Sequence, residues 1–127
     1  MSNTKLKGEK KMENPRYILQ RSIDTYGESH IIDLFFEESA ELTKALLKAR
    51  RYGTSPERMA AIVDEIADVS ICLEYLKMIY QCDKAVADRI DYKLERTAQR
   101  CAEINARGHI GNRLYHAYVE RKNRYDK

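Results

Sequence analysis

The chain has 127 residues, of which 43% are hydrophobic and 34% charged, and this size suits one compact domain. Only 5 glycines and 2 prolines are present, too few for the many turns of a sandwich or barrel, so an all-α fold is favoured. No apolar run approaches the roughly 20 residues of a membrane span, and the N-terminal residues lack the apolar stretch of a secretory signal. We therefore expect a cytoplasmic protein with no membrane partner.

The net charge of +3 comes from the two ends of the chain. Residues 1–16 hold five Lys or Arg and two Asp or Glu, and residues 105–127 hold six and two. Residues 17–104 hold twelve and sixteen, so this body carries 12 − 16 = −4. Basic tails without a recognised nucleic-acid motif are usually solvated, and we expect no nucleic-acid partner.

The three cysteines, Cys72, Cys82 and Cys101, form no CxxC pair, so neither a disulfide framework nor a zinc knuckle is supported. We expect them to be reduced. Cys72 and Cys101 lie on apolar helix faces and are expected to pack as small hydrophobic side chains.

Two helices are predicted before residue 53. An Asn-Pro pair at residues 14–15 is a good N-cap and first helical position for a short helix over about residues 15–25. Gly27 ends that helix. A long helix follows over about residues 29–52, and Gly53 suits the left-handed residue that often follows a helix.

Further helices are predicted after residue 54. A Ser-Pro pair at residues 55–56 starts a third helix that runs to about residue 80. Asp83 is placed to cap a fourth helix over about residues 84–107, which Gly108 closes. A short terminal helix is assigned to residues 112–123.

These elements predict three segments of the chain. Residues 1–14 form a disordered basic tail, and residues 15–107 form a helical domain like a four-helix bundle with a short additional N-terminal helix. Residues 108–127 form a C-terminal extension that carries the short terminal helix.

Four acidic residues fall on helix faces that should enter the core. At about 100° per residue, Glu38 lies in the middle of the apolar stripe of the second predicted helix, with Glu41 about 60° away. Glu65 lies in the apolar stripe of the third predicted helix, with Asp68 about 60° away. Each helix therefore directs two acids, three residues apart, toward the interior.

Two interpretations of these acids are open. A single buried carboxylate usually pairs with Lys or Arg from a neighbouring helix. Two facing pairs are harder to explain in this way, because like charges 4 Å apart repel by roughly 4 kcal/mol at an effective dielectric constant of 20. A bound cation would remove this repulsion, and oxygen ligands without His or Cys select Mg²⁺ or Mn²⁺. A ferritin-like di-iron site is disfavoured, because no His follows a Glu at the required spacing.

A row of cations follows one side of the fourth predicted helix. Arg89, Lys93, Arg96 and Arg100 lie about 60–120° from Ile90, beside the apolar stripe that contains this residue. Such a row can be a solvated flank that borders the core. Beside a carboxylate-bound metal it can instead neutralise phosphate oxygens.

In these motifs the sequence resembles the MazG-like, all-α nucleoside triphosphate pyrophosphohydrolase superfamily, whose pattern is EExxE followed by ExxD on the next helix. Here the motifs read EESAE at residues 37–41 and EIAD at residues 65–68, with 23 residues between them. The resemblance covers roughly residues 17–104 and is closest to compact single-domain members, including those carried by phages. The residues after about 104 are not part of the pattern.

The resemblance implies roles for individual residues. Glu38, Glu41, Glu65 and Asp68 match the metal ligands of the family, and Glu37 adds a carboxylate near the attacking water. Lys93 and Arg96 match positions that contact phosphates. The resemblance also implies a homodimer or a dimer-of-dimers tetramer in which the neighbouring subunit helps to complete the nucleotide pocket.

The resemblance leads us to expect an enzyme that hydrolyses a nucleoside triphosphate, preferably a deoxynucleoside triphosphate, to the monophosphate and pyrophosphate with Mg²⁺ or Mn²⁺. Glu37 or Glu41 is the expected proton acceptor. No GxxxxGK[ST] loop is present, so kinase or motor chemistry is disfavoured. Two alternatives remain: a phosphoribosyl-ATP pyrophosphatase-like activity, and a non-catalytic helical oligomerisation protein with a structural cation site.

Overall fold

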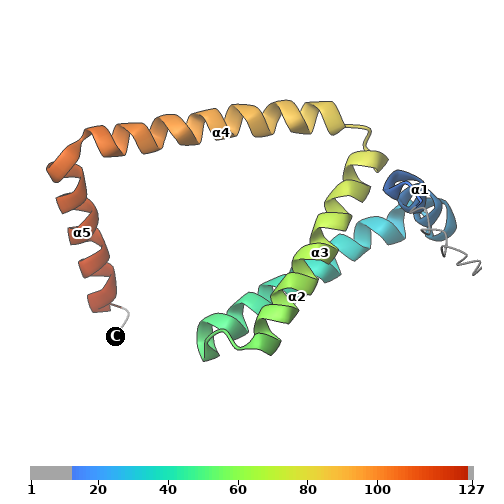
Figure 1. Ribbon diagram of the computed structural model, residues 1–127, viewed down its shortest axis with the longest axis horizontal. Helices are drawn as coiled ribbons and strands as arrows, with labels where there is room; N and C mark the ends of the chain where they lie inside the picture. Colours follow the sequence, from blue (N-terminus) through green and yellow to red (C-terminus); the bar gives the residue numbers. More distant parts are fainter. Residues whose placement is uncertain (1–12, 126–127) are drawn as a thin grey trace, which may run out of the picture. The chain divides into compact units, whose positions relative to one another are not determined.

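The computed structural model describes residues 13–125, apart from the side chains of residues 109–115 and 125. These residues form five α-helices and no β-strand, which confirms the predicted all-α class (Figure 1). The helices are α1 (Pro15–Tyr26), α2 (Glu28–Tyr52), α3 (Pro56–Ile79), α4 (Asp83–Ala106) and α5 (Gly108–Tyr125). Most of the tail predicted at residues 1–14 lies outside the described residues. None of the helices in the described part of the chain is both long enough and apolar enough to span a membrane.

The predicted helix starts at the two prolines are confirmed. The Asn14 side chain accepts a hydrogen bond from the backbone N–H of Arg16 at 3.0 Å, and Pro15 follows as the first helical residue. The Ser55 hydroxyl accepts a hydrogen bond from the backbone N–H of Arg58 at 3.2 Å. Each cap satisfies one backbone donor that the first helical turn leaves without a partner.

The predicted helix ends at Gly27 and Gly53 are confirmed, but the backbone conformation at Gly53 differs from the prediction. Both glycines have positive φ, 87° and 83°, but their ψ values of 152° and 167° are extended rather than left-handed helical. This region of backbone conformation is essentially restricted to glycine. The prediction of a left-handed residue at Gly53 was therefore right in the sign of φ and wrong in ψ.

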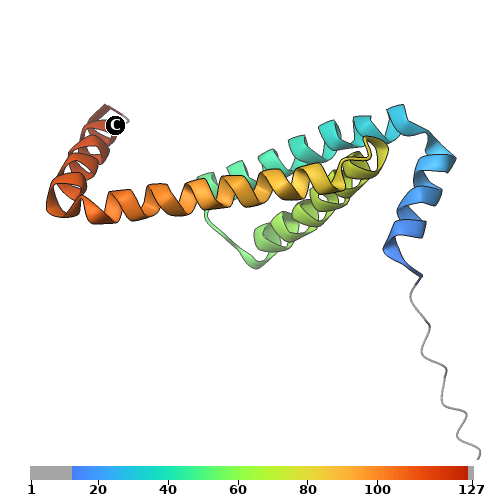
Figure 2. The same cartoon turned by 90° about the horizontal axis from the view of Figure 1, so that it is seen from above.

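Helices α2 and α3 form an antiparallel hairpin joined by residues 53–55, and Figure 2 shows the connecting loop from above. Arg58 stabilises this loop, because its guanidinium group donates hydrogen bonds to the backbone oxygens of Tyr52 and Gly53 at 3.1 and 3.0 Å. Helix α1 packs against both long helices. Among the described side chains, the buried hydrophobic ones come from these three helices: Ile23, Ile31, Ala45, Ile62 and Cys72.

The described part of the chain divides into two compact units, of which the first ends at Cys82 and the second begins at Asp83. The second unit contains α4 and α5, and no residue of α4 is buried. The expected burial of the α4 stripe is therefore wrong, since Ile90 and Leu94 are more than half exposed and Cys101 is also exposed. Helical periodicity identifies the apolar face of a helix but does not say what covers it.

Helix α5 is longer than predicted. It begins at Gly108, the residue expected to close the preceding helix, and it extends to Tyr125 instead of covering only residues 112–123. Gly108 has a φ of 55°, so it adopts the positive φ expected of a glycine that follows a helix. The next helix therefore starts directly at this glycine.

Candidate metal centre

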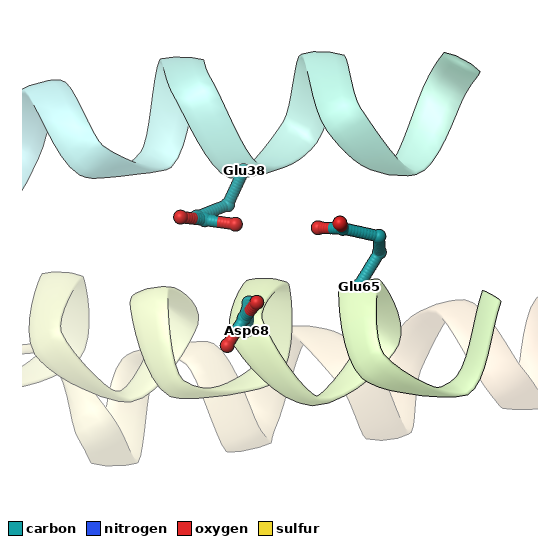
Figure 3. Close-up of side chains that lie close together, drawn as sticks. All are labelled: Glu38, Glu65 and Asp68. Atoms are coloured by element: carbon teal, nitrogen blue, oxygen red, sulfur yellow. The ribbon is translucent and has the colours of Figure 1, made fainter. Parts of the chain in front are cut away.

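Three carboxylates meet between the two helices of the hairpin. Glu38 projects from α2, and Glu65 and Asp68 project from successive turns of α3 toward it (Figure 3). One oxygen of each residue lies within 4.8 Å of the corresponding oxygens of the other two. The antiparallel packing of α2 on α3 thus joins the two acidic motifs, which are separated by 23 residues in the sequence.

The cluster is partly buried, and no Lys or Arg of the described residues forms an ion pair with it. All three residues are half-buried, and Oε2 of Glu65 is buried without a hydrogen-bond partner in the described structure. A buried oxygen without a partner costs free energy, because it has lost its hydration. Among the described residues, no Lys or Arg nitrogen lies within 4.0 Å of these carboxylates. Pairing with Lys or Arg, the alternative left open by the sequence, is not found in this part of the chain.

The charges of the cluster act most strongly on Glu38. Burial raises the pKa of Glu38, and the negative charges of Asp68 and Glu65 raise it further. Hydrogen bonds that a protonated Glu38 makes with Glu65 and Asp68 act in the same direction. Without metal, the folded protein therefore holds a proton on Glu38 more tightly than the unfolded chain does, because three ionised carboxylates are unfavourable together.

This shift predicts how stability depends on pH in the absence of metal. The ordinary pKa is 4.5 and the folded value is higher, so the folded state retains a proton that the unfolded chain has released. The free energy of unfolding contributed by Glu38 should fall as pH rises between these two values and should be constant above the folded value. Thermal unfolding in EDTA across this range should show the decline. Glu38→Gln should make it smaller, and identical slopes in both proteins would contradict the shift.

Glu37 and Glu41 lie on α2 outside the group of three. Both side chains are exposed, and Oε1 of Glu41 lies 3.8 Å from Nζ of Lys44. Glu41 is one helical turn from Glu38, which places it on a neighbouring part of the same face. The structure therefore brings together three of the four predicted ligands. The roles expected for Glu41 and Glu37 remain predictions.

The predicted phosphate-binding residues lie on α4, in the second unit. Lys93 and Arg96 are exposed. Arg89, from the same row, has its guanidinium carbon 4.7 Å from the centre of the Tyr92 ring. The row is thus formed by exposed cations of one helix, and a contact with phosphate remains a prediction.

Cys72 lies beside the carboxylate cluster, although the sequence predicted it only as a residue of the hydrophobic core. It is buried as predicted, and burial raises the pKa of its thiol. The charges of Glu38 and Asp68 raise this pKa further. Cys72 follows Asp68 by four residues, so helical spacing alone places the two side chains near each other. The thiol stays protonated and adds no further negative charge to the site.

The donor set fits a hard divalent cation. Three carboxylates with no His or Cys among the close ligand atoms match the oxygen ligands of Mg²⁺ and Mn²⁺. The buried, unpartnered Oε2 of Glu65 supports this fit, because a bound cation would satisfy it. Comparisons of the chain with family models, curated proteins and solved structures gave no match.

Proposed function

We propose that the protein is a Mg²⁺-dependent hydrolase that cleaves the α–β phosphoanhydride of a nucleoside triphosphate, preferably a deoxynucleoside triphosphate. The products would be the nucleoside monophosphate and pyrophosphate. The observation that carries this proposal is the meeting of Glu38, Glu65 and Asp68 between α2 and α3. These acids come from EExxE and ExxD motifs in the order found in the MazG-like superfamily, which the sequence resembles.

In this proposal the acidic residues have two tasks. Glu38, Glu65 and Asp68 hold the cation, and Glu41 completes the ligand set from the next turn of α2. Bound Mg²⁺, or Mn²⁺ in its place, supplies positive charge to the phosphate oxygens and lowers the pKa of water. Glu37 or Glu41 accepts the proton of the attacking water, and the exposure of both side chains leaves them accessible to solvent.

Replacing Lys93 or Arg96 with Ala should weaken catalysis if these residues bind the triphosphate. Loss of one hydrogen bond to a charged group costs roughly 1.5–3 kcal/mol, which corresponds to about a 10- to 150-fold decrease in kcat/KM. Stability should change by less than about 0.5 kcal/mol, because both side chains are exposed. Steady-state kinetics and thermal unfolding measure the two effects.

Arg89→Ala is the matched control, since it removes a cation from the same row of α4 but lies outside the Lys-Leu-Glu-Arg run at residues 93–96. Equal and negligible effects of all three substitutions would remove the phosphate-binding roles. The carboxylate site would be unaffected by that result.

The reaction itself is tested with a panel of common and modified ribo- and deoxyribonucleoside triphosphates in the presence of Mg²⁺. Pyrophosphate and monophosphate should appear in equal amounts. Release of orthophosphate would mean that a different phosphorus is attacked. No turnover of any nucleotide would contradict the proposal. Phosphoribosyl-ATP belongs in the panel, because the related pyrophosphatase activity is an alternative within the same superfamily.

A second candidate function is a non-catalytic oligomerisation protein in which the carboxylates hold a structural cation. The observation that favours it is the large number of exposed apolar side chains on the helices of the first unit, among them Phe36, Leu47 and Val63. This function predicts that the cation binds and stabilises the fold while no phosphoanhydride is hydrolysed. A homodimer or a dimer-of-dimers tetramer agrees with either function.

A further inference from the structure

Helix α3 has a second apolar face in addition to the one that packs against α2. Ile62 and Cys72 are buried on the face toward the rest of the hairpin. Four large apolar side chains on an adjoining face of α3, together with Tyr80 directly after the helix, are between 47% and 64% exposed: Met59, Val63, Ile66, Leu73 and Tyr80. A helix that is apolar on nearly all sides is normally buried on all sides. Helix α3 therefore has more apolar surface than its own hairpin covers.

The exposed residues are spaced as in a helix that packs against another helix. Together with Ser70 and Lys77, they recur at alternating intervals of four and three residues from position 59 to position 80. We call these seven residues the α3 stripe. Alternating intervals of four and three residues are the heptad pattern by which two helices interlock their side chains. The pattern indicates that the partner of the α3 stripe is a helix.

The stripe is large enough to act as a binding surface. At roughly 100 Å² of exposed area per side chain, its five large apolar residues present on the order of 500 Å², a patch size that often marks an interaction site. Two such patches would bury about 1,000 Å² in total, the lower limit for a specific interface. The buried hydrophobic residues of the first unit are few, so this additional burial would stabilise it.

The arrangement of residues in the stripe favours a second copy of the same chain. Ser70 lies at the centre, with Ile66 and Leu73 on either side of it and Met59 and Tyr80 at the two ends. An antiparallel copy would therefore place Met59 opposite Tyr80 and Ile66 opposite Leu73, with Val63 against the aliphatic stem of Lys77 and the small Ser70 opposite itself. A two-fold interface requires this kind of self-complementarity.

The single charged residue of the stripe determines the orientation. Lys77 forms an ion pair with Glu74 of the same helix at 2.6 Å. Parallel pairing would place the two copies of Lys77 against each other. Antiparallel pairing separates them by about 21 Å along the helix axis, at 1.5 Å per residue, which is beyond the Debye length of about 8 Å at physiological salt. Repulsion between identical charges therefore disfavours the parallel arrangement.

We propose that the protein forms a two-fold symmetric dimer in which the α3 stripes of two copies pack antiparallel, with Ser70 near the symmetry axis. Glu65 and Asp68 lie roughly 100° and 160° from Ile66 around α3, so the carboxylate cluster faces away from this interface. The proposal is independent of the proposed hydrolysis, because it rests only on the α3 stripe.

Ile66→Glu in the full chain tests the interface. Antiparallel pairing places Ile66 opposite the apolar Leu73 of the second copy, so the charge would be buried there and the dissociation constant of the dimer should rise at least tenfold. Leu46→Glu is the matched control, because Leu46 on α2 and Ile66 are similarly exposed, at 45% and 49%, but Leu46 lies outside the stripe. Sedimentation equilibrium measures association, and circular dichroism checks that both variants fold. A monomeric parent chain, or equal effects of the two substitutions, would overturn the proposal.

Cysteine crosslinking tests the orientation in a chain with Cys82 and Cys101 replaced by Ser. Antiparallel pairing places Ile66 opposite Leu73 of the second copy. The double variant Ile66→Cys/Leu73→Cys should therefore form a covalent dimer on mild oxidation, whereas Ile66→Cys alone should form little. Efficient crosslinking of Ile66→Cys alone would show that position 66 lies opposite itself, and it would overturn the antiparallel arrangement.

Discussion

Glu38→Gln should lower Mg²⁺-dependent turnover by at least about 100-fold, because loss of one carboxylate ligand removes several kcal/mol of electrostatic stabilisation. The same substitution should leave the metal-free protein as stable as the parent or more stable. Glu38 is half-buried beside Glu65 and Asp68, and its raised pKa shows that its ionised form is disfavoured there. A neutral amide of the same size removes the repulsion. Opposite changes in activity and metal-free stability are therefore expected from one substitution.

Asp64→Asn is the matched control for this experiment. Asp64 precedes Glu65 on α3, but its side chain is exposed and lies outside the cluster. It should retain parental turnover and stability, since surface substitutions usually change stability by less than about 0.5 kcal/mol. Initial rates of pyrophosphate release and thermal unfolding in EDTA provide the two measurements. Near-normal turnover of Glu38→Gln would remove Glu38 from the ligand set.

The helix boundaries were predictable because they depend on local chemistry. A side-chain cap followed by proline at residues 14–15 and 55–56 fixes where α1 and α3 begin, and no distant contact is needed to recognise it. The position of Glu38, Glu65 and Asp68 on inward faces follows equally from helical periodicity. Their meeting required only that α2 and α3 pack as neighbours, which the short connection between them favours.

The features that the sequence left open depend on packing partners. The apolar stripe of α4 was recognised, but its residues Ile90 and Leu94 are exposed. The prediction that they are buried failed because a periodic pattern identifies an apolar face without showing which surface covers it. The position of Glu41 has a similar origin. Around the axis of α2, Glu41 lies only about 60° from Glu38, and along the axis it lies nearly one turn further on. These two displacements leave its side chain exposed beside Lys44. Whether a carboxylate at the edge of a helix face reaches a site depends on its rotamer and on any ligand present.

Mg²⁺ should stabilise the folded chain by about 4 kcal/mol when its concentration is a thousandfold above its dissociation constant, and by about 2.7 kcal/mol at a hundredfold excess. The site exists only when α2 and α3 are packed together, because Glu38 comes from one helix and Glu65 and Asp68 from the other. The unfolded chain cannot hold the three carboxylates in this arrangement. Binding of the cation therefore shifts the folding equilibrium toward the folded state.

Unfolding curves with EDTA and with increasing Mg²⁺, each at the same ionic strength set with NaCl, measure this effect. The constant ionic strength matters, because added salt also screens repulsion among acidic side chains. Asp64→Asn should keep the shift and Glu38→Gln should lose most of it. Amide hydrogen exchange should show that the added protection is greatest in α2 and α3. Superimposable curves for the parent protein would mean that the three carboxylates do not form a Mg²⁺ site, and the proposed hydrolase mechanism would then lose its basis.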